Sequence, residues 1–295
     1  MNAEERLDLA IHSPDFLSLS GSRLYGTSMP DSDYDFRGFV VPPFEYLTGI
    51  KSFKSKDLEG DHKIYSLKRW FELILEGDPQ CTELMFTPKH LIKEISEIGH
   101  RAIGIGLKYA LSNKSYSRIM GYSNGEWRKA MAIKIVPEKR KKQEPEILND
   151  FWNCYDWLSR EEKELIIKTT NEGRPQKIIS STSGLGSKRK SQVEKYGYCT
   201  KSAAHSIRLL KQVTELMNTG EVVFPRPESD LLKSIRNGEM SKEEVTEIYD
   251  LSRTVAEATR PQSILADRPD TSSVWEEYIQ ITKENIVDYL KKDNC

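Results

Sequence analysis

The sequence predicts an α+β fold, in which a small mixed β-sheet is followed by a mainly helical domain. Runs with strand-like alternation are confined to the first 90 or so residues, and nearly everything after them has helical spacing. The chain has 295 residues, which is near the size at which one hydrophobic core divides. We therefore expect a first domain over residues 1–96 and a mainly helical domain over residues 97–295.

The predicted strands come early in the chain. Residues 16–20 (FLSLS) predict a short strand, and residues 33–41 (DYDFRGFVV) alternate and then become apolar, as a half-buried strand does. Residues 51–61 have the composition of a polar hairpin, and residues 62–65 predict a further strand. Residues 81–86 (CTELMF) are also strand-like.

One predicted helix lies among these strands. It begins near Ser66 and stops at Gly77 and Pro79, and its apolar residues recur at helical spacing: Leu67, Trp70, Phe71, Ile74 and Leu75. Helical periodicity returns over residues 201–219 and 241–260. Two polar segments without periodicity, residues 138–148 and 171–191, predict exposed, flexible basic loops.

Composition excludes several classes of protein. Forty-four Lys and Arg residues face 45 Asp and Glu, so a net charge of −1 provides no bulk attraction to nucleic acid. The four cysteines form no C-x-x-C motif and the five histidines no H-E-x-x-H motif, so no zinc site is predicted. The sequence contains neither a signal peptide nor an apolar run of membrane-spanning length. We expect a soluble, cytoplasmic protein with no membrane partner.

The most informative segment is Gly21-Ser22, followed after ten residues by Asp33-Tyr34-Asp35. In a strand, Asp33 and Asp35 project from the same side with Cα atoms about 6.6 Å apart. Two carboxylates held together repel each other unless a cation lies between them or one is protonated. Mg²⁺ prefers a few carboxylates together with substrate phosphates, as in two-ion phosphoryl transfer. A glycine at a strand end lets backbone N–H groups approach a phosphate, and the serine hydroxyl adds a donor.

These residues carry a family resemblance. The stretch GSRLYGTSMPDSDYDFRGF resembles the signature of the DNA polymerase β-like nucleotidyltransferase superfamily, and most closely a bacterial and phage branch of predicted nucleotidyltransferases. The resemblance continues through the segments D-H-K-I-Y-S-L (61–67), G-D-P (77–79), E-L-M-F (83–86), K-S-A-A-H-S-I-R-L-L (201–210), T-G (219–220) and I-R-N-G (235–238). It covers most of the chain and is weakest over residues 125–190.

The resemblance implies a Mg²⁺-dependent nucleotidyltransferase that moves NMP from an NTP to an acceptor hydroxyl and releases pyrophosphate. An RNA 3′ end (tRNA-like), a protein and a small molecule are all possible acceptors. It implies a two-ion Mg²⁺ site, with Mn²⁺ as an alternative, held by Asp33, Asp35 and a third carboxylate. Asp61 is the first choice for that third group, Glu83 the second and Glu59 the third.

The nucleotide-binding candidates come from two segments. In the first, Gly21, Ser22 and Arg23 would hold the triphosphate, while Arg37 would contact phosphate or pair with an acid of its own domain. In the second, Lys201, His205 and Arg208 stand at i, i+4 and i+7, which places them on one face of a helix. We expect that cationic face to cover the triphosphate.

Other classes of function remain open at this stage. A catalytically silent relative would serve as a nucleotide sensor, an antitoxin or a scaffold, although the intact Gly-Ser and Asp-x-Asp motifs argue against decay. A structural RNA-binding protein would use the basic residues 138–142 and 188–190, which the near-zero net charge disfavours. Residues 183–188 lack the spacing of a phosphate-binding loop, and the basic run 139–142 is interpreted as a solvated surface.

Overall fold

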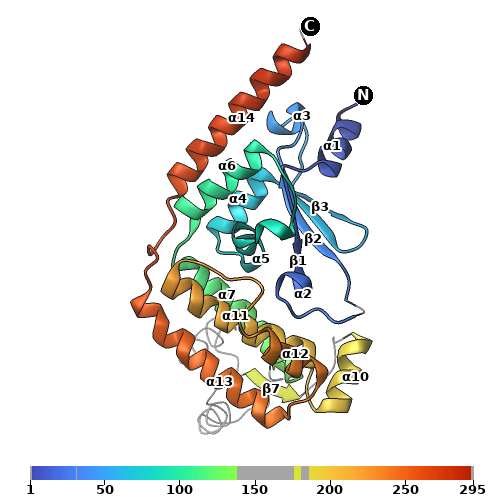
Figure 1. Cartoon of the computed structure of the whole chain (residues 1–295), viewed down its shortest axis with the longest axis vertical. Helices are drawn as coiled ribbons and strands as arrows, with labels where there is room; N and C mark the ends of the chain where they lie inside the picture. The colour runs from blue at the N-terminus through green and yellow to red at the C-terminus, as the bar shows by residue number, and fades with distance from the viewer. Residues whose placement is uncertain (1, 31, 138–175, 181–185, 294–295) are drawn as a thin grey trace.

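A five-stranded mixed sheet and a helical layer make up the computed structural model, which describes residues 2–30, 32–137, 176–180 and 186–293. Figure 1 shows the sheet beside α1, α4 and α6, and the layer of α7, α11, α12 and α13 next to it. The predicted α+β class, with a sheet core and a helical C-terminal part, is confirmed.

The sheet has the strand order β3-β4-β2-β1-β5. β2 runs parallel to β4, while the other neighbouring pairs are antiparallel. The strands are β1 (Phe16–Ser20), β2 (Asp35–Val40), β3 (Ser55–Leu58), β4 (His62–Ser66) and β5 (Ile92–Ile95). The predicted strands at 16–20, 33–41 and 62–65 and the hairpin within 51–61 are therefore confirmed, with β2 beginning two residues later than predicted.

Each face of the sheet is covered by its own hydrophobic cluster. On one face, Phe39 stacks between Phe16 and Trp70, with ring centroids 5.4 Å and 4.4 Å away. On the other face, Val40 and Ile64 pack with Ile11 of helix α1 (Ala3–His12). Because side chains alternate along a strand, Asp35 and Arg37 share the face of Phe39. The polar end of that face is where the candidate site lies.

The helix predicted from Ser66 is α4 (Leu67–Leu75), capped by the Ser66 side chain, which accepts a hydrogen bond from the Arg69 N–H. The strand predicted over residues 81–86 is wrong, because that segment is helical, as α5 (Pro79–Glu83) followed by a 3₁₀ turn. The Asp78 side chain accepts hydrogen bonds from the N–H groups of Gln80 and Cys81, and Pro79 occupies the first helical position. These two features initiate a helix despite the strand-like composition.

The helical layer is built around α11 (Thr200–Thr219), which packs against the other helices of this layer. The predicted helices at 201–219 and 241–260 are confirmed. Between Trp127 and Tyr249 the rings are parallel with centroids 3.8 Å apart. The helices of this layer are α7 (Lys114–Ala130), α10 (Ser187–Tyr196), α11, α12 (Ser229–Asn237) and α13 (Lys242–Thr259).

The C-terminal helix α14 (Thr271–Asp293) returns to the sheet. Its Val274 and Ile281 are buried in the cluster that contains Trp70, together with residues of α6 (Glu97–Ile105). The short helix α3 (Phe44–Leu47) also contacts it, since the rings of Phe44 and Tyr289 stack at 4.8 Å. The hydrophobic clusters therefore join α6 and α14 to the sheet, whereas the division of the chain at residue 96 remains a prediction.

Part of the loop prediction falls outside the described residues, namely all of 138–148 and, within 171–191, residues 171–175 and 181–185. Residues 176–180 are not a loop but form β7 (Gln176–Ser180), antiparallel to β6 (Ile133–Pro137), and residues 187–191 belong to α10. This strand pair brings together segments that are far apart in the sequence, which local periodicity does not report. Within the described residues, no helix is long and apolar enough to cross a membrane.

We predict that Phe39→Ala lowers the free energy of unfolding by about 3–5 kcal/mol, because it leaves a cavity between two stacked rings. Ile50→Ala is the matched control, since Ile50 is 73% exposed, and it should stay within about 0.5 kcal/mol of the wild type. Urea unfolding measures both, and equal losses would contradict this account of the sheet core.

Candidate functional site

Three strands end together at one edge of the sheet. Ser20 of β1 pairs with Asp35 of β2, and Asp61, whose φ is +57°, is the turn residue just before β4, where His62 pairs with Phe36. Neighbouring residues in paired strands project from the same face, about 5 Å apart. We call Ser20, Asp35 and Asp61 the carboxylate edge. Figure 1 shows this end of β1 and β2 beside α2 (Gly21–Leu24) and facing the helical layer.

Gly21 makes room for the Asp35 carboxylate. Its φ of +62° lies in the region that favours glycine, and a Cβ on this residue would stand 1.8 Å from Asp35 Oδ2. No other residue fits without displacing the carboxylate. Gly21 was predicted as a site residue, and the reason is steric. Its backbone lies so close to the Asp35 carboxylate that a side chain has no room.

The pKa of the Asp35 carboxyl is raised, first by burial and then by the negative charge of Asp61, with a smaller contribution from Asp33. The cations Arg37 and Lys201 act in the opposite direction. Asp35 is thus the group on which two other carboxylates act. Such an arrangement favours a bound cation or a proton over a bare carboxylate.

Asp33 lies outside the strand, because β2 begins at Asp35. Its side chain is exposed, and its backbone is held by Arg23, whose guanidinium donates to the carbonyl oxygens of Ser32 at 2.8 Å and of Asp33 at 3.3 Å. The same guanidinium stacks on the Tyr34 ring at 3.6 Å. Arg23 therefore supports the loop that carries Asp33, and phosphate binding by Arg23 remains a prediction.

Ser20 is a site residue that sequence reasoning missed. It is 3% exposed, and its Oγ has no hydrogen-bond partner among the described residues. A buried hydroxyl without a partner is costly, so its position beside Asp35 points to a ligand oxygen or water. Only the pairing of β1 with β2 places Ser20 on the same face as Asp35, and the sequence alone does not report that pairing. Ser22, the serine predicted from the sequence, is half-buried. Its carbonyl oxygen accepts a hydrogen bond from the Thr27 N–H at 2.8 Å.

The donor set of the carboxylate edge fits Mg²⁺, because it consists of carboxylate and hydroxyl oxygens. Among the described residues, however, no three His, Cys, Asp or Glu side chains already stand close enough to form a metal-binding group. A metal set of Asp33, Asp35 and Asp61 stays a prediction. Glu59, the third choice, is exposed at the tip of the β3–β4 hairpin.

Glu83, the second choice for the third carboxylate, is buried in a different environment. Its carboxylate accepts from Arg208 at 2.6 Å and from the Tyr25 hydroxyl at 2.6 Å, and the side chains of Glu83 and Arg208 are each 3% exposed. Arg208 also lies over the Tyr25 ring at 3.8 Å and donates to Gln212. We call these four residues the buried network. It joins α5 of the sheet side to α11 of the helical layer.

The predicted cationic face of α11 is therefore wrong in two of its three members. Arg208 is buried and its charge is used by Glu83, so it does not face solvent. His205 is partly buried, and burial together with the neighbouring Arg208 charge lowers its pKa to about 4. It is neutral near pH 7. Lys201 alone is exposed, and its charge acts on Asp35.

Arg37 lies between these two groups of residues. It is partly buried on the Asp35 face of β2 and donates weakly to the Tyr65 hydroxyl at 3.4 Å. Its charge lowers the pKa of Asp35. This hydrogen bond goes to a tyrosine and not to an acid, so both predicted uses of Arg37, an ion pair within its own domain and phosphate binding, stay predictions.

A small mixed sheet whose edge carries a glycine, a serine and adjacent carboxylates, backed by a helical layer, defines the DNA polymerase β-like nucleotidyltransferases. The model of the RNA repair pathway DNA polymerase beta family (RlaP) matches residues 15–293, and the chain belongs to that family. The predicted superfamily is thereby confirmed.

A relative from Enterobacteria phage T4 shares part of this sequence. The uncharacterized 38.9 kDa protein in the nrdC-mobD intergenic region is 39% identical over 25% of this chain. The match spans about a quarter of the relative, 26% of its length. No solved structure matches the chain significantly.

We predict that Arg208→Ala lowers the free energy of unfolding by about 3–5 kcal/mol, because it leaves the buried Glu83 charge unpaired. Arg69→Ala is the control, since Arg69 forms a partly exposed pair with Glu72 and its loss should cost below about 1 kcal/mol. The double variant Arg208→Met, Glu83→Gln removes both charges and should recover part of the loss. Equal denaturation midpoints for Arg208→Ala and Arg69→Ala would contradict the buried network.

We also predict that Asp61→Asn lowers the pKa of Asp35, because it removes the largest like-charge contribution, while burial still keeps that pKa above the ordinary value. The Asp35 carboxyl then loses its proton at lower pH. Carboxyl NMR titration measures this shift. Asp57→Asn is the control, since Asp57 pairs with Lys63 on the outer strand and does not act on Asp35. An unchanged Asp35 titration in Asp61→Asn would show that the two side chains do not face each other.

Proposed function

We propose that the protein transfers an NMP unit from an NTP to an acceptor hydroxyl and releases pyrophosphate. The observation that supports this most is the carboxylate of Asp35, which is seated over Gly21 and on which the negative charge of Asp61 acts. Membership of a polymerase β-like family agrees with that chemistry. The exact reaction and its acceptor go beyond what the family name states.

Each residue of the site has a distinct part in this proposal. Asp33, Asp35 and Asp61 would hold Mg²⁺, or Mn²⁺ in its place. The bound cation would neutralise the charge that develops on the triphosphate. The Ser20 hydroxyl and the backbone at Gly21 and Ser22 orient the phosphates.

The raised pKa of Asp35 reflects burial and neighbouring negative charge, and a bound cation would offset both effects. The carboxylate lies at the end of the sheet beside the unpartnered Ser20 hydroxyl. Asp35 is therefore assigned as a cation ligand. Lys201 stands across from it at the start of α11 and adds a point charge for the triphosphate.

The acceptor we favour is an RNA 3′ hydroxyl. The family is described as belonging to an RNA repair pathway, and a terminal ribose hydroxyl is the nucleophile that such a pathway would extend. A protein hydroxyl and a small molecule are the remaining possibilities. All three require the same chemistry at the carboxylate edge.

We predict that Asp35→Asn reduces transfer of label from α-phosphate-labelled NTP by a factor on the order of 10² to 10³, because it removes a ligand of the cation that neutralises the triphosphate charge. Asp57→Asn, which changes the same charge on the outer strand, should keep wild-type transfer. The acceptors offered are total RNA, protein extract and small-molecule extract, each with every NTP in turn. Wild-type transfer by Asp35→Asn would overturn the mechanism, and tight NTP binding without pyrophosphate release in the wild type would favour the silent sensor.

A further inference from the structure

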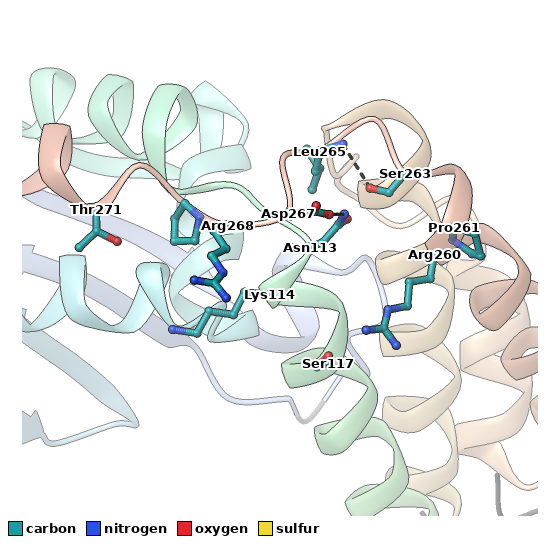
Figure 2. Close-up of a pocket in the computed structure, with 11 residues that line it drawn as sticks. Asn113, Lys114, Ser117, Arg260, Pro261, Ser263, Leu265, Asp267, Arg268 and Thr271 are labelled. Carbon is teal, nitrogen blue, oxygen red and sulfur yellow. Dashed lines mark hydrogen bonds between the residues drawn. The ribbon is translucent and has the colours of Figure 1, made fainter. Parts of the chain in front are cut away.

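A large cavity lies away from the carboxylate edge. Its volume is about 1020 Å³, and it is bounded by the start of α7, the turn at the end of α13 and the segment that leads into α14. Figure 2 shows the side chains that line it. The polar ones used below are Lys114, Ser117, Arg260, Asp267 and Arg268.

Hydrogen bonds fix the walls of this cavity. The Asn113 N–H donates to the carbonyl of Ala266 at 2.8 Å, and its side chain donates to the Asp267 carboxylate at 3.1 Å. The Ile264 N–H donates to the carbonyl of Met217 at 3.0 Å, near the end of α11. The segment between α13 and α14 is therefore held against two helices, and the cavity is formed before any ligand arrives.

The charge of the cavity is positive. Three of its lining residues are cations (Lys114, Arg260 and Arg268), and the one carboxylate, Asp267, already accepts from Asn113. Among the described residues, Lys114 and Arg268 form no salt bridge, although Figure 2 shows Arg268 reaching from its segment towards Lys114. Two cations directed into one space repel each other unless an anion lies between them.

The first turn of α7 adds to this field. Lys114 and Ser117 belong to it, and the Asn113 side chain makes no capping hydrogen bond to the helix. The positive end of a helix of 17 residues therefore opens towards the same cavity. Phosphate oxygens accept hydrogen bonds from cationic side chains and bind at the N-terminus of a helix.

The position of the cavity excludes the triphosphate of the reacting nucleotide. Lys201 and Met217 stand at opposite ends of α11, sixteen residues and about 24 Å apart along the helix axis. Figure 1 likewise shows the segment between α13 and α14 at the opposite side of the helical layer from α2. That distance is longer than a triphosphate.

We infer that this cavity is a phosphate site that holds the sugar–phosphate backbone of an RNA acceptor, away from the end that reacts. The inference rests on the proposed RNA acceptor. The net charge of −1 means that such an acceptor is bound through local cationic sites and not through bulk attraction. Lys114 and Arg268 are the contacts that a strand crossing the cavity would use.

The test measures binding, so that it is read separately from transfer activity. Stem–loop RNAs with stems of about 4 and about 12 base pairs, fluorescently labelled, are titrated by anisotropy at several salt concentrations against the full chain. The variant is Lys114→Ala, Arg268→Ala. The control is Lys68→Ala, Lys283→Ala, which removes two exposed charges from α4 and α14, outside the cavity. A third arm titrates a fluorescent NTP.

We expect the cavity variant to bind the long RNA roughly fivefold more weakly and the short RNA as the wild type does. The slope of the logarithm of affinity against the logarithm of salt should fall by about 2 for the long RNA. The control should match the wild type. Equal losses in the variant and the control, or an unchanged affinity for the long RNA, would overturn the inference. Weakened NTP binding with unchanged RNA binding would also overturn it, and would assign the cavity to a free nucleotide.

If no acceptor is labelled but the cavity variant still binds the long RNA more weakly, the proposed function fails and the RNA site stands. The reverse result, transfer to RNA without any effect of Lys114 and Arg268, leaves the proposed function standing and removes this site. The two proposals are therefore decided by different measurements.

Discussion

The buried ion pair between Arg208 and Glu83 is the interaction on which the geometry of the candidate site depends. It connects α11 with α5, and both charges are removed from water, so each must find its partner in a narrow range of positions. Tyr25 and Gln212 satisfy the remaining polar atoms of the pair. Because α11 is thereby fixed against the sheet side, Lys201, about two turns before Arg208, lies within electrostatic reach of Asp35. A salt bridge of this kind contributes more to specificity of arrangement than to net stability.

The sequence predicted those elements whose signals are local. β1, β2, β4 and α4 followed from alternation, helical spacing and the glycine that ends α4, since each signal is contained in a short window. The segment 81–86 was predicted as a strand because its composition is strand-like, whereas the helix begins from the Asp78 cap and Pro79 outside that window. The pairing of β6 with β7 was missed for a different reason. Its partners are separated by dozens of residues, and no local period reports such a contact.

The predictions for the candidate site were also right where the signal is local and wrong where packing decides. Gly21, Asp35 and Asp61 were predicted from a motif and from strand ends. The pairing of β1 with β2 brings Asp35 over Gly21, and Asp61 acts on Asp35 from the turn before β4. The face formed by Lys201, His205 and Arg208 was predicted from helical spacing alone, which identifies residues that share a face but not what packs against it. Glu83 and Tyr25 pack there, so a spacing that suggested a phosphate-binding surface describes, for Arg208, an interior contact. Ser20 was missed because a serine in a strand carries no signal until its neighbour in the sheet is known.

One helix relates the carboxylate edge to the cationic cavity. Lys201 belongs to the first turn of α11, and Met217, near the other end, holds the segment that forms the cavity wall. Since the buried network fixes this helix in its middle, the separation of the two sites is set by helix geometry and does not depend on a hinge. A chain with almost no net charge has to bind a polyanion at a few separated points. Points held at a constant distance select acceptors by length and shape, which is a form of specificity that requires no contact with the bases.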